Sequence, residues 1–325
     1  MVDRESNICG QLAAVTPHLR LGKAASKVQA KPMFKGTFTA LVTPFRGGEI
    51  DFEAFEHLVE TQISSGVTGI VVVGTTGESP TLSHTEQERL IELTVGFVRG
   101  RCKVLAGTGS NSTRDTLVST RRAERLRANG ALVVAPYYNK PNQEGLFRHF
   151  RDVAQSTSLP LMLYNIPGRC GVDIQPETVV RLAEECSNIV SIKEASGSVA
   201  RVSDLRARLP NAFTILSGDD SLTLPFMSVG AVGVVSVASN LFPSEVCALV
   251  EAFNSGDMKL AGQLHRKLLP VFQDLFIEPN PVPVKTALSW RGAMSGECRL
   301  PLCEMSEANE KRLRESIVAF ERAKA

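Results

Sequence analysis

From Thr37 onward, hydrophobic positions alternate between short apolar runs and longer amphipathic segments. The short runs are almost continuous in apolar and β-branched residues, as parallel strands covered on both faces require. Between them, apolar residues follow helical spacing, as Phe52, Phe55 and Val59 do within residues 51–65. Eight runs predict strands: residues 37–45, 69–74, 104–109, 131–138, 161–167, 189–195, 213–218 and 233–240.

Strand and amphipathic helix alternate about every 28 residues, and this repeat predicts the fold class. Joined by right-handed crossovers, eight such α/β units close into a (β/α)8 TIM barrel. The competing architecture, a doubly wound open sheet, usually carries GxGxxG after its first strand, and residues 43–49, TPFRGGE, do not match it. Two pairs, Ser83 with Glu86 and Ser112 with Asp115, have capping-box spacing and predict helix starts.

The chain after the eighth run is predicted to be helical near residues 244–254, 257–277 and 307–323. The proline-rich sequence EPNPVPVK, residues 278–285, lies between the last two of these helices. We expect the first helix to complete a barrel of residues 34–256. Residues 257–325 are then a C-terminal helical appendage, which packs on the barrel or supplies a subunit interface.

Residues 1–33 differ from the rest of the chain. They are rich in Lys and Arg after Glu5 and show no buried-strand pattern. We therefore expect a disordered N-terminal extension. A natural start at Met33 and a targeting peptide are the alternatives.

Composition narrows the function classes. Of the 325 residues, 43% are hydrophobic and 22% are charged, with a net charge of +2, so nucleic acid and anionic membranes are not the expected partners. No apolar stretch is long enough to span a bilayer. Seven scattered cysteines without a CxxC pair indicate reduced thiols and a cytoplasmic protein. The five histidines lack HxH or HxxxH spacing, which argues against a metal site.

Lys193 is the strongest candidate for chemistry because it interrupts a strand-like run. Strand alternation puts Ile189, Ser191 and Lys193 on one face, and if Val190 and its neighbours meet the outer helices, Lys193 projects into the barrel. Burial lowers the pKa of an amine, and the free amine can attack a ketone to form an imine. The alternative is a structural salt bridge to Glu194 or to another acid at the strand end.

Other polar residues also follow the ends of predicted strands, where barrel active sites lie. The phenol of Tyr164 can donate and accept a proton, although a packing role is the alternative. Thr75 and Thr76 could hold a small carboxylate or simply form a turn. Arg169 could pair with a carboxylate or remain solvated. The GDD sequence at 218–220 is better interpreted as a helix start than as a metal site.

Seven motifs occur in an order and spacing that resemble the bacterial dihydrodipicolinate (4-hydroxy-tetrahydrodipicolinate) synthase family, from about Phe34 to near the C-terminus. They are GTTGES, AGTG, PYYNKP, LYNIPGR, SIKEASG, LSGDD and EPNPVPVK. The resemblance implies condensation of pyruvate with L-aspartate 4-semialdehyde, in the diaminopimelate route to lysine. It also implies a Schiff-base mechanism without cofactor or metal. Members of the family are usually homotetramers, so we expect the same assembly here.

The resemblance also implies roles for individual residues. Lys193 matches the Schiff-base lysine, Tyr164 the proton donor and acceptor, and Thr76, with Thr75 beside it, the threonine that binds pyruvate and relays protons. Tyr138 resembles the relay tyrosine that enters the site from a neighbouring subunit. Further substrate contacts are expected at Arg169, Val235 and Gly218.

In lysine-inhibited members of the family, an allosteric pocket lies between subunits. The corresponding residues here are Ser79, His84, Asn111 and Tyr137. Three neighbouring positions depart from the pattern of strongly inhibited members, namely Pro80, Gln87 and Asp115. The sequence therefore leaves feedback inhibition by lysine open.

Two other functions compete. N-acetylneuraminate lyase and the 2-keto-3-deoxy sugar acid aldolases share the lysine and the tyrosine, but Arg169 and Tyr138 favour the synthase because a short semialdehyde needs a carboxylate anchor. A catalytically silent barrel, acting as a regulatory subunit, is the alternative from another class. The presence of every chemical position argues against it.

Overall fold

The computed structural model describes residues 33–324, which belong to one compact unit, Lys31–Ala325. The predictions for residues 1–32, a disordered extension or a targeting peptide, lie outside the described residues. None of the helices within 33–324 is long and apolar enough to cross a membrane. The boundary near residue 256, between barrel and appendage, stays a prediction.

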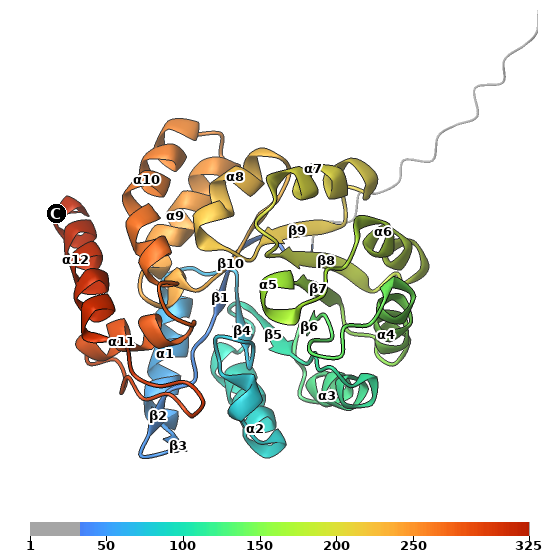
Figure 1. Cartoon of the computed structure of the whole chain (residues 1–325), viewed down its shortest axis with the longest axis horizontal. Helices are drawn as coiled ribbons and strands as arrows, with labels where there is room; N and C mark the ends of the chain where they lie inside the picture. The colour runs from blue at the N-terminus through green and yellow to red at the C-terminus, as the bar shows by residue number, and fades with distance from the viewer. Residues whose placement is uncertain (1–32, 325) are drawn as a thin grey trace, which may run out of the picture. The chain divides into compact units, whose positions relative to one another are not determined.

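Eight parallel strands close into a barrel in the order β1-β10-β9-β8-β7-β6-β5-β4, and β4 pairs with β1 (Figure 1). Each predicted run overlaps one of these strands, so the TIM barrel is confirmed. The strands are shorter than the runs because the last residues of each run enter the loops. The bounds are β1 Gly36–Ala40, β4 Gly69–Val72, β5 Lys103–Gly107, β6 Gly130–Val134, β7 Leu161–Asn165, β8 Ile189–Glu194, β9 Thr214–Ser217 and β10 Gly233–Ser236.

The first predicted strand, 37–45, ends early. Its last residue belongs instead to a two-stranded antiparallel hairpin of β2 (Phe45–Arg46) and β3 (Glu49–Ile50). The turn contains Gly47 and Gly48 at φ of 62° and 85°, which glycine adopts without steric cost. From sequence alone these glycines indicated only that TPFRGGE is not a dinucleotide-binding motif.

An outer layer of helices surrounds the barrel (Figure 1). Both hydrogen bonds of the capping box between Ser83 and Glu86 form, whereas Ser112 only accepts from the N–H of Asp115. Phe52 is 43% exposed and thus does not join the buried face. The helices are α1 Phe52–Ser64, α2 His84–Val98, α3 Thr113–Arg125, α4 Gln143–Gln155, α5 Pro167–Cys170, α6 Pro176–Glu185, α7 Val199–Arg208, α8 Thr223–Ser228 and α9 Pro243–Asn254, with 3-10 turns η1 Ser79–Thr81, η2 Asp220–Leu222 and η3 Ala238–Asn240.

The core has two parts. One fills the barrel interior and includes Phe38, Met162 and Leu216, while the larger one lies between strands and helices. The register of β7 against β8 shifts, because Leu161 pairs with Ile189 but Met162 pairs with Ser191. The prediction for the start of β8 was therefore wrong: Ile189 packs in the outer core and Val190 against the inner one. After the irregularity the predicted alternation holds.

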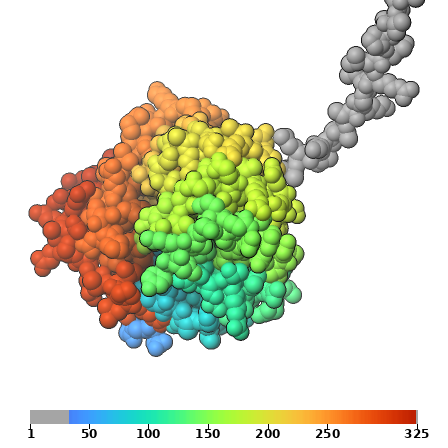
Figure 2. Space-filling view, turned by 45° about the vertical axis from the view of Figure 1, so that its right-hand side comes forward, coloured from blue at the N-terminus to red at the C-terminus, as the bar shows by residue number. Residues whose placement is uncertain are grey.

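The appendage packs against the barrel through contacts between α10 and α9, and its orange and red residues cover one side of the barrel in Figure 2. It consists of α10 Met258–Asp274, α11 Val282–Trp290 and α12 Glu307–Lys324. The sequence predicted α10 and α12 but not α11. Pro281 precedes α11 and Pro283 lies in its first turn, where a missing N–H is tolerated, so the proline-rich sequence begins a helix.

Candidate active site

Lys193 and Tyr164 are register partners on the adjacent strands β8 and β7. Lys193 is 6% exposed, and its Nζ lies 4.1 Å from the centroid of the Tyr164 ring. The predicted location of Lys193 inside the barrel is therefore confirmed. Glu194 is not its ion-pair partner, because the carboxylate of Glu194 accepts from Nε of Arg201 at 2.8 Å.

The surroundings of Lys193 favour the uncharged amine. Burial lowers its pKa to about 7; the negative charge of Asp220 opposes this shift, and the positive charge of Arg169 contributes to it. An amine with a pKa near 7 is unprotonated in a large fraction of molecules at neutral pH. Such an amine can act as a nucleophile.

Asp220 is a site residue that the sequence analysis missed. One carboxylate oxygen, Oδ2, accepts from the backbone N–H groups of Val237 and Ala238, both at 2.9 Å. Burial raises its pKa to about 6, while these hydrogen bonds and one from Ser236 oppose the shift. Asp219, beside it, caps η2 through the N–H of Ser221, so the predicted helix start is confirmed. The fully buried Asp220 supplies a negative charge close to Lys193.

Tyr164 keeps its proton at neutral pH. Burial raises its pKa to about 12, although Arg169 and a hydrogen bond with the side chain of Thr75 oppose this shift. A protonated phenol beside the amine can donate a proton to a leaving oxygen and recover it later. The arrangement is therefore suited to imine formation.

The loop after β4 carries the two threonines, and the appendage holds it in place. Asn280 Nδ2 donates to Thr76 Oγ1 at 2.9 Å. Lys285 Nζ pairs with Glu78 Oε1 at 2.6 Å, and both side chains are fully buried. The N–H of Arg299 donates to the second oxygen of Glu78. The appendage is thus part of the site, which the sequence analysis did not predict.

Three further predicted residues lie close to this centre. Arg169, in α5, donates from Nη2 to the backbone oxygen of Asn280 at 3.2 Å. Val235 is buried in the inner core with Tyr164. A Cβ added at Gly218 would lie 2.9 Å from Cε of Lys193, so the lysine chain passes where only glycine leaves room.

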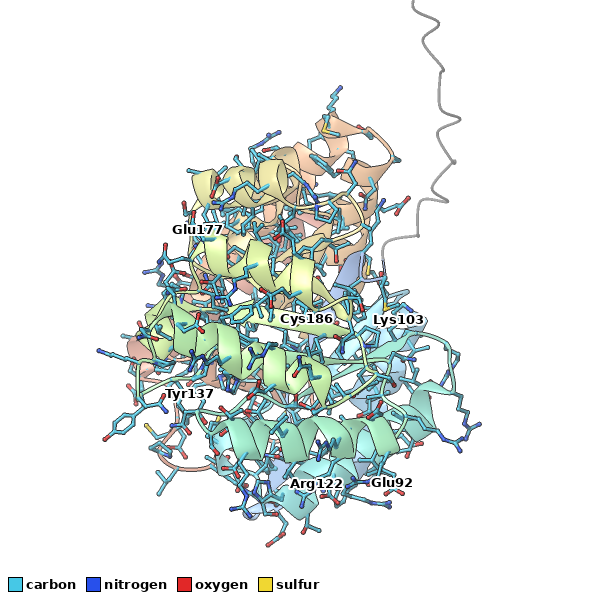
Figure 3. The ribbon with its side chains drawn as sticks, turned by 90° about the vertical axis from the view of Figure 1, so that its right-hand side faces the viewer. Glu92, Lys103, Arg122, Tyr137, Glu177 and Cys186 are labelled. Carbon is cyan, nitrogen blue, oxygen red and sulfur yellow. The ribbon has the colours of Figure 1, made fainter. Side chains whose placement is uncertain are left out.

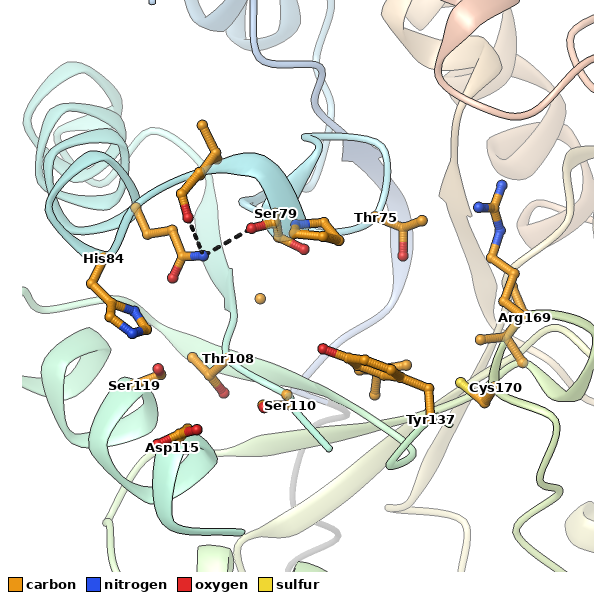
Figure 4. Close-up of a pocket in the computed structure, with 17 residues that line it drawn as sticks. Thr75, Ser79, His84, Thr108, Ser110, Asp115, Ser119, Tyr137, Arg169 and Cys170 are labelled. Atoms are coloured by element: carbon orange, nitrogen blue, oxygen red, sulfur yellow. Dashed lines mark hydrogen bonds between the residues drawn. The ribbon is translucent and has the colours of Figure 1, made fainter. Parts of the chain in front are cut away.

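A cavity of about 380 Å³ extends from this centre toward α2 and α3. Figure 4 shows Thr75 and Arg169 toward one end of it and His84 toward the other, with Tyr137 between them. Ser79 also lines the cavity. An adjoining cavity of about 30 Å³ is lined by Tyr164 and shares Thr75 with the larger one. Of the four residues predicted for a regulatory pocket, three therefore line the same cavity as Thr75 and Arg169.

Two predicted residues lie elsewhere. Asn111 is not among the lining residues, and its backbone oxygen accepts from Asn139. Tyr138 is 87% exposed at a φ of +73° and does not line the cavity of its own chain. Its neighbour Tyr137 lies at the same end of the barrel as Glu177, opposite Lys103 (Figure 3).

Comparisons with known proteins identify the family of the chain. The model of the dihydrodipicolinate synthetase family matches residues 33–320. The 4-hydroxy-tetrahydrodipicolinate synthase of Endomicrobium trichonymphae is 50% identical over 288 residues, covering 89% of this chain and 99% of that protein. The structure of the enzyme of the same name from Methylacidiphilum fumariolicum SolV has a TM-score of 0.88 at 56% identity, covering 89% of this chain and 96% of that chain.

A third similar structure is a chloride-inhibited dihydrodipicolinate synthase from Acinetobacter baumannii, complexed with pyruvate. It is 41% identical with a TM-score of 0.86, covering 88% of this chain and 99% of that chain. Similarity of this extent, in sequence and in structure, spans nearly all of the described residues. The chain belongs to the dihydrodipicolinate synthetase family.

Proposed function

We propose that this chain is a 4-hydroxy-tetrahydrodipicolinate synthase, a Schiff-base-forming lyase that condenses pyruvate with L-aspartate 4-semialdehyde. Relatives of this name are half identical to it over most of its length, and one related synthase was crystallised with pyruvate. The observation that carries the mechanism is the buried amine of Lys193, with a pKa near 7, against the phenol of Tyr164. The activity places the enzyme in the diaminopimelate route to lysine.

The first half of the mechanism forms the nucleophile. The amine of Lys193 attacks the ketone carbon of pyruvate, and the ketone oxygen becomes a hydroxyl group. Tyr164 supplies the proton with which this oxygen leaves as water, so a protonated imine remains. Its positive charge draws electrons from the methyl group, which gives a proton back to the Tyr164 phenolate and becomes an enamine. Asp220 stabilises the positive charge of the imine.

The second half forms the new bond. The enamine carbon attacks the aldehyde, and the aldehyde oxygen takes a proton and becomes a hydroxyl group. The amine of the semialdehyde then attacks the imine carbon, and the carbon–nitrogen bond to Lys193 breaks. The lysine is regenerated, and since the imine itself accepts the electrons, the proposed chemistry requires no external cofactor or metal.

We assign substrate binding to the residues around the cavity. Thr75 and Thr76 hold the carboxylate of pyruvate, with Val235 and Gly218 beside its carbon chain. Arg169 lines the cavity and receives the carboxylate of the semialdehyde, because a guanidinium can pair with it through two hydrogen bonds. Sugar acid aldolases must instead hold a chain of hydroxyl groups.

The substrate assignment is tested by comparing condensation of pyruvate with aspartate semialdehyde against cleavage of N-acetylneuraminate and 2-keto-3-deoxy sugar acids. We expect kcat/KM for the condensation to exceed that for either cleavage by at least about 100-fold, because the carboxylate of the semialdehyde can pair with Arg169. An Arg169→Ala variant should lose most of the condensation activity. Faster cleavage of a sugar acid would overturn the assignment.

We further propose that Tyr138 enters the active site of a neighbouring copy, within a homotetramer of two such dimers. A tyrosine that is 87% exposed on its own chain supports this, since large aromatic side chains are favoured at interfaces. The six cysteines within the described residues are free, which supports a cytoplasmic location. We assign a regulatory role to the cavity end formed by Ser79, His84 and Tyr137, with Asn111 beside it.

A further inference from the structure

The side chain of Asn280 reaches the candidate site from the segment between α10 and α11. It is 5% exposed, and its Nδ2 donates to Thr76 Oγ1 at 2.9 Å. Its backbone oxygen accepts from Arg169 at 3.2 Å. One residue of the appendage therefore contacts both the threonine and the arginine to which substrate binding is assigned.

The direction of the hydrogen bond determines what the threonine can do. A hydroxyl group has one proton and two acceptor lone pairs. Because Thr76 Oγ1 accepts from the amide of Asn280, its own proton does not lie between the two side chains and is available for a different acceptor. A carboxylate is such an acceptor, since it has no proton to donate in return.

The other amide atom of Asn280 supports a role beyond packing. Its Oδ1 is buried and has no hydrogen-bond partner within residues 33–324. A buried acceptor without a donor is costly, so a residue needed only to fill space would be better replaced by an apolar one. An amide at this position is instead explained by what its NH2 group does for Thr76.

We propose that Asn280 is a positioning residue that orients the hydroxyl proton of Thr76 toward the carboxylate of the bound keto acid. This inference rests on the proposed function. The buried pair of Glu78 and Lys285 also holds the loop that carries Thr76, two residues beyond the hydroxyl group on which the amide acts. The appendage thereby sets the direction of one hydrogen bond to the substrate.

The test uses Asn280→Asp, which keeps the shape but replaces the donating NH2 group by an oxygen. That oxygen accepts the Thr76 proton and draws it away from the substrate. We expect kcat/KM for pyruvate to fall about 10- to 100-fold, as misplacement of a binding group does. Asn280→Ala, which lacks the donor and adds no charge, must also lose activity.

The control is Asn309→Ala. Asn309 is another asparagine of the appendage, and its Nδ2 donates to Glu278 Oε1 at 2.7 Å. Glu278 lies two residues before Asn280 in the chain, but Asn309 does not line the site. It should keep full activity. Thermal unfolding of all three variants reports whether the fold is retained.

A double-mutant cycle separates orientation from general damage. In a Thr76→Val background, which has no hydroxyl to orient, Asn280→Asp should cause no further loss. An additive loss would overturn the inference. Unchanged activity of Asn280→Asp would also overturn it, because it would mean that the amide oxygen, and not the NH2 group, faces Thr76 and already accepts its proton. Absence of a borohydride-trapped pyruvate adduct in the unmodified protein overturns the function and this inference together. If the adduct forms but the losses are additive, or Asn280→Asp keeps its activity, only this inference is overturned and the proposed function stands.

Discussion

At the level of single residues, the reactivity of the site depends on how burial and the neighbouring charges together set the protonation of Lys193. Burial and Arg169 favour the free amine that attacks the ketone, whereas Asp220 favours the positive charge that appears once the imine forms. The two requirements belong to different steps. A lysine with a pKa near 7 satisfies both, because neither form is strongly excluded at neutral pH.

Gly218→Ala tests how closely the lysine chain is confined. The new Cβ would lie 2.9 Å from Cε of Lys193 and 2.7 Å from Cβ of Ala195, which is too close for either. Displacement of the amine should lower kcat/KM for pyruvate by about 10-fold or more in steady-state assays. Gly96→Ala is the matched control, since nothing lies within 4 Å of its added Cβ. Equal activity of both variants would show that Lys193 has room to move.

At the level of elements, the buried pair of Glu78 and Lys285 joins the β4 loop to α11 across the barrel's edge. The loop needs this support because Glu78 itself has a φ of 54°, in the left-handed region that non-glycine residues seldom adopt. The ion pair and the hydrogen bond from Asn280 thus hold a strained loop next to the site. The appendage has a structural role and a role in positioning the threonines.

Lys285→Met should therefore destabilise the protein strongly, since it leaves the carboxylate of Glu78 buried without its partner. We expect a loss of about 3–5 kcal/mol in the free energy of unfolding, measured by urea denaturation. The double variant Lys285→Met with Glu78→Gln removes the uncompensated charge and should recover part of the loss. Arg101→Met, which breaks an exposed pair with Glu60, should have a much smaller effect. A similar small loss for Lys285→Met would contradict this role.

The elements that the sequence predicted and those it missed differ in physical character. The eight strands follow from continuous apolar runs, and Ser83 marks the start of α2 through its capping box. The hairpin of β2 and β3 was missed because two-residue strands have no periodicity to detect. The face predicted for Val190, at the start of β8, was wrong because a register shift against β7 reverses the alternation there. Such a shift depends on the neighbouring strand and leaves no signal in the local sequence.

At the level of the whole molecule, the same distinction separates the site residues. Lys193 and Tyr164 could be predicted because a barrel brings strand ends together regardless of the loops between them. Asn280 and Lys285 could not, because they contact residues 204 and 207 positions away and no local pattern encodes such contacts. Tyr138 was predicted from family resemblance alone, and within one chain its phenol meets no other site residue.

The central claim is that a neutral Lys193 inside the barrel captures pyruvate. It is tested most directly by adding pyruvate and borohydride at a series of pH values and measuring, by peptide mass spectrometry, the initial rate of reduced adduct formation on each lysine. The fraction of Lys193 present as the free amine increases as the pH rises through its pKa of about 7. Below that pH most lysine is protonated and unreactive.

We predict a single adduct, on Lys193, whose rate of formation rises roughly tenfold from about pH 6 to about pH 8 and then levels off, as a group titrating near 7 requires. Lys285, also buried but paired with Glu78, should remain unmodified and serves as the internal control. A rate still rising steeply above about pH 9 would indicate an ordinary lysine pKa. No adduct on Lys193, or an adduct on another lysine in its place, would contradict the mechanism.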